Sequence, residues 1–89
     1  MHRIIVFSKD GCHLCERAVN ILKDLSKNHK FRLEVVEITK NEALFEKYFL
    51  KIPVVRVDGK DMFDAEDLRT PLEYKRKLMN LVSDLDNFD

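Results

Sequence analysis

The fold is decided by one stretch near the N-terminus, Ile4-Ile5-Val6-Phe7-Ser8-Lys9-Asp10-Gly11-Cys12-His13-Leu14-Cys15. Its first four residues are an unbroken apolar run, mostly β-branched, which is typical of a strand buried on both faces. Gly11 marks a turn, and from His13 to about Ser26 the apolar residues recur at helical spacing. The two cysteines therefore lie where a strand turns into a helix.

Hydrophobic patterns typical of strands and of helices continue beyond this first helix. The Asn41 side chain can cap a short helix, and Asp58-Gly59 is a strong signal for a tight hairpin turn. Asp64 or Thr70 can cap the last helix, whose main part is expected to begin at Pro71. The patterns predict, in order, a strand at residues 31–38, a helix at 41–49, strands at 54–57 and 60–63, and a helix from Pro71 to about Val82, with residues 83–89 frayed.

The order of these elements predicts the topology. A strand, a helix and a second strand form a parallel pair with a right-handed crossover. The hairpin adds two strands, one of them antiparallel to its neighbours. We therefore expect an α/β fold in which a four-stranded mixed β-sheet is flanked by three helices, in the order β-α-β-α-β-β-α. A length of 89 residues fits one domain, spanning residues 1–89.

Composition excludes several classes of protein. The 16 Lys and Arg balance 16 Asp and Glu, so charge gives no attraction to nucleic acid or to an anionic membrane. A hydrophobic fraction of 45% is too high for a disordered chain. Two cysteines are too few for a secreted disulfide scaffold. No stretch is typical of a signal peptide or a membrane span, so we expect a cytoplasmic protein.

Three ordinary roles compete for the pair Cys12-His13-Leu14-Cys15. A structural disulfide over so short a loop would stabilise the fold by only about 2 kcal/mol. The cysteines could be buried core residues, although Cys12 lies in the loop before the helix. A structural zinc site needs four ligands, and the three histidines are poorly placed to complete one. We therefore expect no metal site.

A reactive dithiol explains the placement better, because a Cys-x-x-Cys pair between a strand and a helix is typical of a redox site. Free amide groups and the positive end of the helix dipole stabilise a thiolate on Cys12. Lys9 and His13 can add positive charge, whereas Asp10 opposes them. We expect Cys12 to be the nucleophile and Cys15, one turn along, to be the resolving thiol that releases the substrate.

The segment from Phe7 to Cys15 closely resembles the active-site segment of the glutaredoxins, which have the thioredoxin fold. Ile52-Pro53-Val54 is similar to the Val-Pro element of that family, and residues 55–60 resemble its hairpin. The pair Cys-His-Leu-Cys in so short a chain looks like the small glutaredoxin-like proteins of bacteria and archaea. The resemblance covers nearly the whole chain and implies a thioredoxin fold with Pro53 in the cis form.

The resemblance also implies how a partner is bound. The main chain of an extended peptide or of glutathione would pair with Ile52, and Lys9 would attract a glutathione carboxylate. Glutathione is thus a candidate co-substrate, and no tightly bound cofactor is implied. The implied contact residues for substrate or glutathione are Lys9, His13, Ile52, Pro53 and Asp67.

The chain departs from the glutaredoxin pattern where that family binds glutathione. Phe63-Asp64 stands in place of two glycines that let the backbone approach glutathione closely. Lys51 replaces a threonine, and Leu14 replaces an aromatic residue. A glutathione carboxylate would face a run of acids relieved only by Lys60, namely Asp58, Asp61, Asp64, Glu66 and Asp67.

These features favour a thiol–disulfide oxidoreductase that reduces protein or low-molecular-weight disulfides through Cys12 and Cys15. Its electron donor would be glutathione or a flavoprotein reductase. In one alternative, two chains share an iron–sulfur cluster through Cys12 with the help of glutathione. In another, the domain is a non-catalytic binding module whose cysteine pair is vestigial.

Overall fold

Strands and helices follow one another in the predicted order, with one extra short helix. The computed structural model describes residues 1–87, and within them no helix is long and apolar enough to cross a bilayer. Ile38, expected in the second strand, belongs to the extra helix. The elements are β1 (His2–Ser8), α1 (His13–Leu25), β2 (Phe31–Glu37), the 3-10 helix η1 (Ile38–Lys40), α2 (Glu42–Tyr48), β3 (Val54–Val57), β4 (Lys60–Phe63) and α3 (Pro71–Asp86).

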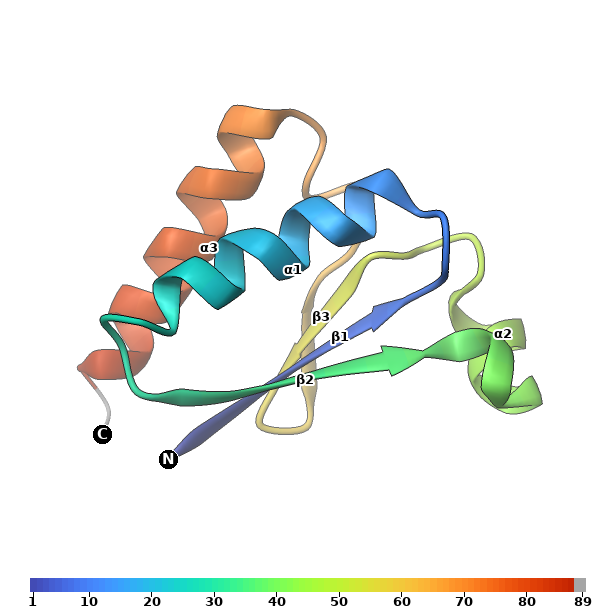
Figure 1. The fold of residues 1–89 in the computed structure, drawn as a ribbon, viewed down its shortest axis with the longest axis horizontal. Coiled ribbons are helices and arrows are strands. Elements are labelled where there is room, and N and C mark those ends of the chain that lie inside the picture. Colours follow the sequence, from blue (N-terminus) through green and yellow to red (C-terminus); the bar gives the residue numbers. More distant parts are fainter. Residues whose placement is uncertain (88–89) are drawn as a thin grey trace.

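The four strands form one mixed sheet in the order β2-β1-β3-β4 (Figure 1). β1 runs parallel to β2, as the crossover through α1 requires, and β3 runs antiparallel to both β1 and β4. In the β1–β3 pair, Phe7 lies opposite Val54. The residues that follow β1 and those that precede β3 therefore leave the sheet at the same end.

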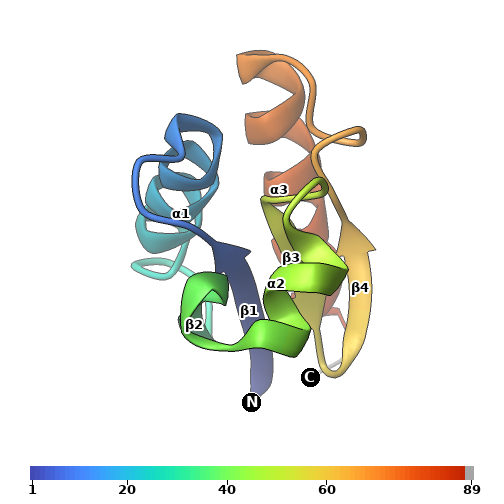
Figure 2. The ribbon, with the colours of Figure 1, turned by 90° about the vertical axis from the view of Figure 1, so that its right-hand side faces the viewer.

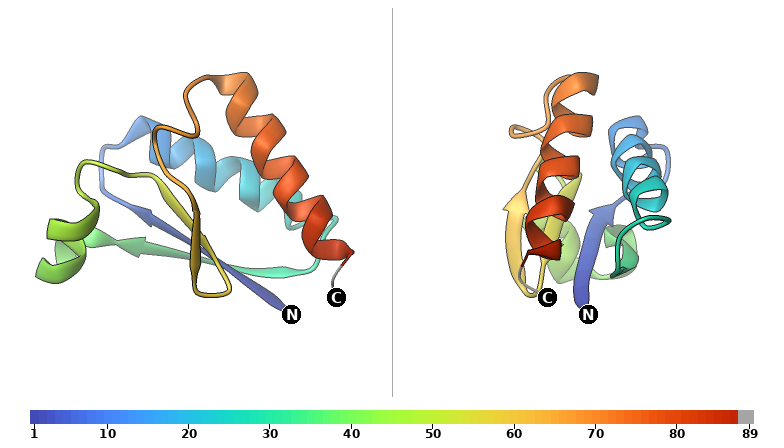
Figure 3. Two further views of the ribbon diagram at one scale, coloured as in Figure 1. Left: turned by 180° about the vertical axis from the view of Figure 1, so that it is seen from behind. Right: turned by 90° about the vertical axis from the view of Figure 1, so that its left-hand side faces the viewer.

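Two apolar clusters lie on opposite faces of the sheet, because alternate residues of β1 point to opposite sides. Ile4 and Val6 pack into the larger cluster with α1 and α3, which lie together on one side (Figure 1, Figure 3). Phe7 packs with Ile38 and Tyr48 in the smaller cluster. The helix α2, which contributes Tyr48, lies apart from α1 and α3 (Figure 2). The helices thus cover both faces, as predicted.

The two later α-helices begin at side chains that cap their first turns. Asn41 Oδ1 accepts a hydrogen bond from the Leu44 N–H at 3.0 Å. Thr70 Oγ1 accepts one from the Glu73 N–H at 3.1 Å, directly before Pro71. Of the two expected starts for the last helix, the main helix therefore takes the later one.

The expected end of α3 near Val82 is wrong, because the helix continues to Asp86. Leu85 packs against the larger apolar cluster, and Asp86 Oδ2 lies 2.5 Å from His29 Nδ1. These tertiary contacts extend the helix through charged sequence that was expected to fray. The last part of that expectation falls on residues 88–89, which lie outside the described residues.

The hairpin turns at Asp58-Gly59, as predicted, and both residues have a positive φ, 49° and 88°. This is the two-residue turn whose twist matches that of paired strands. Asp58 Oδ1 accepts from the Arg3 N–H at 2.9 Å, and Oδ2 lies 2.5 Å from His2 Nδ1. These partners, the Arg3 N–H foremost, lower the pKa of Asp58. The hairpin is therefore bound to the start of β1, far from the cysteines.

A polar network lies within the smaller cluster, beneath α2. The Tyr48 hydroxyl donates to Asp61 Oδ2 at 2.8 Å and accepts from Arg56 Nη2 at 2.7 Å, and its ring stacks on Phe7 at 4.6 Å. Burial raises the pKa of Asp61, but the hydrogen bonds from Arg56 and Tyr48 outweigh burial and lower the pKa overall. By contrast, the buried Tyr74 hydroxyl has no hydrogen-bond partner among residues 1–87.

The two tyrosines make a matched test of this network. Tyr48→Phe leaves two charged groups without their shared partner, so the free energy of unfolding should fall by about 1–3 kcal/mol. Tyr74→Phe removes only an unpaired hydroxyl and should leave the stability unchanged or raised. Urea unfolding followed by circular dichroism measures both, and an equal loss in the two variants would contradict the network.

Candidate active site

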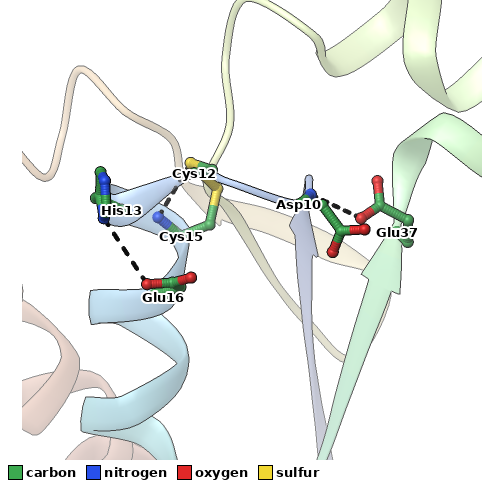
Figure 4. The surroundings of a disulfide bond; sticks show 6 residues. All are labelled: Asp10, Cys12, His13, Cys15, Glu16 and Glu37. Atoms are coloured by element: carbon green, nitrogen blue, oxygen red, sulfur yellow. Dashed lines mark hydrogen bonds and ion pairs between the residues drawn. A yellow bond between two sulfur atoms is a disulfide. The ribbon is translucent and has the colours of Figure 1, made fainter.

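The cysteine pair lies where the chain leaves β1 and enters α1 (Figure 4). Because Phe7 pairs with Val54, the loop of residues 9–12 and the segment before β3 meet at this end of the sheet. That segment contains Ile52 and Pro53, and the peptide bond between them is cis, as the resemblance implied. Two loops far apart in the sequence therefore build the site.

Cys12 and Cys15 form a disulfide with their Cα atoms 5.2 Å apart, within the usual range for such a bond. Cys12 is the N-cap of α1 and is partly exposed, whereas Cys15, in the first turn, is 2% exposed. The Cys15 N–H donates to Cys12 Sγ at 3.2 Å. In the reduced protein this N–H and the positive end of α1 can stabilise a thiolate on Cys12. Cys12 is thus the accessible sulfur.

Glu37, at the end of β2, holds the loop that carries Cys12 (Figure 4). Its Oε1 accepts from the Asp10 N–H at 2.8 Å, and its Oε2 accepts from the Thr39 hydroxyl at 2.7 Å. The Cys12 N–H closes the loop by donating to Lys9 O at 3.2 Å. The hydrogen bond from the Thr39 side chain is the main reason why the pKa of Glu37 lies below its ordinary value.

Glu37 is a functional candidate that the sequence did not single out. Glu37 also caps the short helix η1, where its side chain accepts a hydrogen bond from the Thr39 N–H. The hydrogen bond to Asp10 depends on the parallel pairing of β1 with β2, which brings Ser8 beside Glu37. No local sequence pattern predicts a contact between segments so far apart in the chain.

Lys9 and His13, two of the expected contact residues, are both exposed. The His13 side chain is 95% exposed, and its Nδ1 lies 3.9 Å from Oε2 of Glu16, one turn along α1 (Figure 4). An exposed pair of this kind is weak. Glu16 therefore joins Asp10 as an acid that offsets positive charge beside the cysteines.

Backbone hydrogen bonds hold the segment before Pro53. The N–H groups of Lys51 and Ile52 both donate to Tyr48 O, at 2.8 and 3.1 Å. The Ala65 N–H donates to Lys51 O at 2.9 Å, so the loop after β4 lies against this segment. The main chain of a substrate was expected to pair with Ile52. Because the Ile52 N–H is already bound, only the Ile52 carbonyl remains for that pairing, and it accepts no hydrogen bond from another described residue.

The acids of the hairpin and the following loop do not form one surface beside the cysteines. Asp58 binds the start of β1, and Asp61 pairs with Arg56 at 2.8 Å beneath α2. Asp64, Glu66 and Asp67 lie in the turn after β4, where Asp67 Oδ2 accepts from the Asp64 N–H at 2.9 Å. Asp61 lines the same hollow as Asp64 and Asp67. The expectation that a glutathione carboxylate would face all five acids is wrong for Asp58, which lies at the opposite end of β3 from Pro53.

Two small hollows lie near the site. One of about 300 Å³ is lined by residues that include Lys9, Cys15 and Glu16. The other, of about 160 Å³, is lined by residues that include Lys51 and Asp67. Among residues 1–87 no group of three or more His, Cys, Asp or Glu side chains could hold a metal ion.

Comparison with known proteins gives a family match over most of the chain. A family model described as a glutaredoxin-like domain (DUF836) matches residues 3–83. A search of the curated proteins finds no match.

Solved structures resemble the chain in fold. A protein of Nitrosomonas europaea, solved by NMR in solution, is 34% identical with a TM-score of 0.63, and the match covers 71% of this chain and 76% of that one. A protein of X. campestris, solved by X-ray, is 27% identical with a TM-score of 0.60, covering 86% and 96%. A mutant thioredoxin from Halobacterium salinarum is 17% identical with a TM-score of 0.65, covering 93% and 73%. The chain therefore has the thioredoxin fold, as predicted.

Glu37→Ala should release the Asp10 amide and loosen the loop before Cys12. Hydrogen exchange followed by NMR should show a faster rate at Asp10, whereas Glu37→Gln keeps an acceptor oxygen and most of the protection. Unchanged exchange at Asp10 in the alanine variant would show that Glu37 does not hold the loop.

The same carboxylate should make stability depend on pH. Because the folded-state pKa of Glu37 is lowered, its contribution is present above the ordinary value of 4.5 and is lost as the pH falls through the folded value. The Asp10 amide shift in NMR should therefore titrate with a midpoint below 4.5. A midpoint at or above that value would contradict the assignment.

Proposed function

Because the chain belongs to the glutaredoxin-like domain family (DUF836), we propose that it is a thiol–disulfide oxidoreductase that reduces protein or low-molecular-weight disulfides through Cys12 and Cys15. The observation that carries the proposal is the disulfide at the N-terminus of α1, with one sulfur accessible and the other buried. The fold and the cysteine pair support thiol–disulfide redox chemistry in general. The substrate class and the roles of individual residues are our proposal.

The proposed reaction proceeds in two exchanges. The Cys12 thiolate attacks one sulfur of the substrate disulfide, a bond forms between Cys12 and the substrate, and the first substrate thiolate leaves and takes a proton from solvent. The Cys15 thiol then gives its proton to solvent and attacks Cys12 Sγ. The second substrate thiolate leaves and is protonated. The substrate gains two electrons, and the cysteine pair ends as the disulfide seen here.

The surroundings of the pair supply the proposed supporting roles. The carbonyl of Ile52, beside the cis bond to Pro53, accepts a hydrogen bond from the main chain of the substrate. Lys9 and His13 stabilise the Cys12 thiolate and attract an anionic partner. Two electrons from glutathione or from a flavoprotein reductase return the pair to the dithiol. A reducing compartment such as the cytoplasm suits this cycle.

Two serine variants separate the roles of the cysteines. Cys12→Ser should abolish reduction of a disulfide substrate, because the nucleophile is gone. Cys15→Ser should keep the first exchange and accumulate a mixed disulfide on Cys12, detected by mass spectrometry. Full activity in Cys12→Ser would overturn the proposal, as would a mixed disulfide that forms on Cys15 in that variant. Circular dichroism of both variants checks that the fold is retained.

His13 and Glu16 form a matched pair for the redox potential. His13→Ala removes a cation that stabilises the thiolate, so the potential should become more reducing. Glu16→Gln removes an opposing charge and should make the pair more oxidising. Equilibration with a thiol redox buffer measures both potentials, and shifts in the same direction would refute the electrostatic role.

A further inference from the structure

The outer face of α3 has no partner within the described fold. The buried side chains of α3 pack into the larger apolar cluster, and no element among residues 1–87 lies over its outer side (Figure 3). Two large apolar side chains of α3, Leu72 and Met79, are 71% and 43% exposed. A hollow of about 340 Å³ on this face is lined by Leu72, Lys75, Arg76, Met79 and Asn80. Exposed apolar side chains beside a hollow make this face a candidate for an interaction.

Three exposed polar residues form a row along the same face. Arg76, Asn80 and Asp84 are four residues apart, so they follow one another along one side of the helix. All three are exposed, and their side chains make no hydrogen bond or ion pair within residues 1–87. The row therefore begins with a base, continues with an amide and ends with an acid.

The acid at the end of this row occupies an unfavourable position in its own helix. The C-terminal end of a helix dipole is negative and favours bases, yet the last turn of α3 has no basic residue. Asp86 is compensated by His29, whose Nδ1 lies 2.5 Å from Asp86 Oδ2. Asp84 has no such partner in the part of the chain that the structure describes. A base from outside the chain would compensate it.

The row is complementary to itself when it is reversed. If a second copy of α3 packs antiparallel about a two-fold axis at Asn80, Arg76 of each copy faces Asp84 of the other copy. The two Asn80 side chains then face each other, and they can exchange two hydrogen bonds because a carboxamide has both a donor and an acceptor. A two-fold axis brings the same patch of both copies together, as this arrangement requires. Met79, next to Asn80, adds apolar contact beside the axis.

Other kinds of partner match the row less well. A uniformly acidic partner, such as a nucleic acid or an anionic membrane, would be attracted by Arg76 and repelled by Asp84. A uniformly basic partner would meet the reverse. A partner whose acid and base stand in the opposite order satisfies both ends, and an antiparallel copy of α3 is such a partner.

We infer that the outer face of α3 is a docking surface for a second copy of this chain, in an antiparallel pair held by two Arg76–Asp84 ion pairs around Asn80. One helix face is a small interface, and small interfaces form weak, transient complexes. We therefore expect a dimer with a Kd on the order of 0.1–1 mM. No residue of the row belongs to the candidate active site, so the proposed oxidoreductase function does not depend on the dimer.

The dependence of association on concentration tests the dimer in the wild-type protein. The Cys12–Cys15 disulfide is kept intact, so that no disulfide forms between chains. Sedimentation equilibrium between about 20 μM and about 1 mM should show a rising mean mass. In NMR, the amide shifts of residues 72–84 should change over the same range. A protein that stays monomeric at the highest concentration would overturn the inference.

Two charge reversals test the antiparallel register. Arg76→Glu leaves acids at both ends of the row, and Asp84→Arg leaves bases at both ends. Each variant alone should therefore raise the Kd at least about tenfold. A mixture of the two variants restores both ion pairs and should associate at least as tightly as the wild-type protein. A mixture that does not associate, or a single variant that associates as tightly as the wild type, would overturn the inference.

A matched pair of variants controls for net charge. Lys40→Glu in η1 and Glu46→Arg in α2 make the same changes of charge at exposed positions outside α3. Each should associate like the wild-type protein, and mixing them should not tighten the association. Equal tightening in both mixtures would assign the effect to general attraction between oppositely charged chains and contradict the register. Circular dichroism confirms the fold of all four variants, and disulfide reduction, measured separately, bears only on the proposed function.

Discussion

The pairing of β1 with β3, with Phe7 opposite Val54, is the constraint on which the site depends. The antiparallel register makes the end of β1 and the start of β3 coincide. The cysteine loop and the Pro53 segment are therefore placed together, although about forty residues separate them in the chain. Pairing of β1 with β2 adds Glu37, whose carboxylate ties down the loop before Cys12. The sheet thus positions every part of the reactive end.

At this end of the sheet, the cysteine pair lies beside loops whose backbone N–H groups are already hydrogen-bonded. The first turn of α1 directs the Cys15 N–H at Cys12 Sγ and buries Cys15. On the other side, the backbone N–H groups of residues 64–67 are hydrogen-bonded within the chain. One of these hydrogen bonds joins the turn to the segment that contains Ile52. One helix end therefore favours negative charge on sulfur, while the backbone N–H groups of residues 64–67 already donate to acceptors within the chain.

Local patterns predicted the elements and the reactive pair well, because strands, caps and turns depend on near neighbours. Asn41 and Asp58-Gly59 show this, since each acts through its own side chain or backbone. The end of α3 was missed because Leu85 is held by tertiary packing. The roles of Glu37 and Asp58 were missed for the same reason, because their hydrogen bonds join segments that are distant in the sequence and no periodic pattern predicts them.

The central claim is that Cys12, at the start of α1, is the reactive thiolate of the pair. Limited alkylation of the reduced protein with iodoacetamide, mapped by mass spectrometry at several pH values, tests it most directly. The account predicts that Cys12 is modified first, and at neutral pH faster than an unperturbed cysteine, while Cys15 stays protected. Modification of Cys15 first, or of both cysteines at the rate of an ordinary thiol, would contradict it.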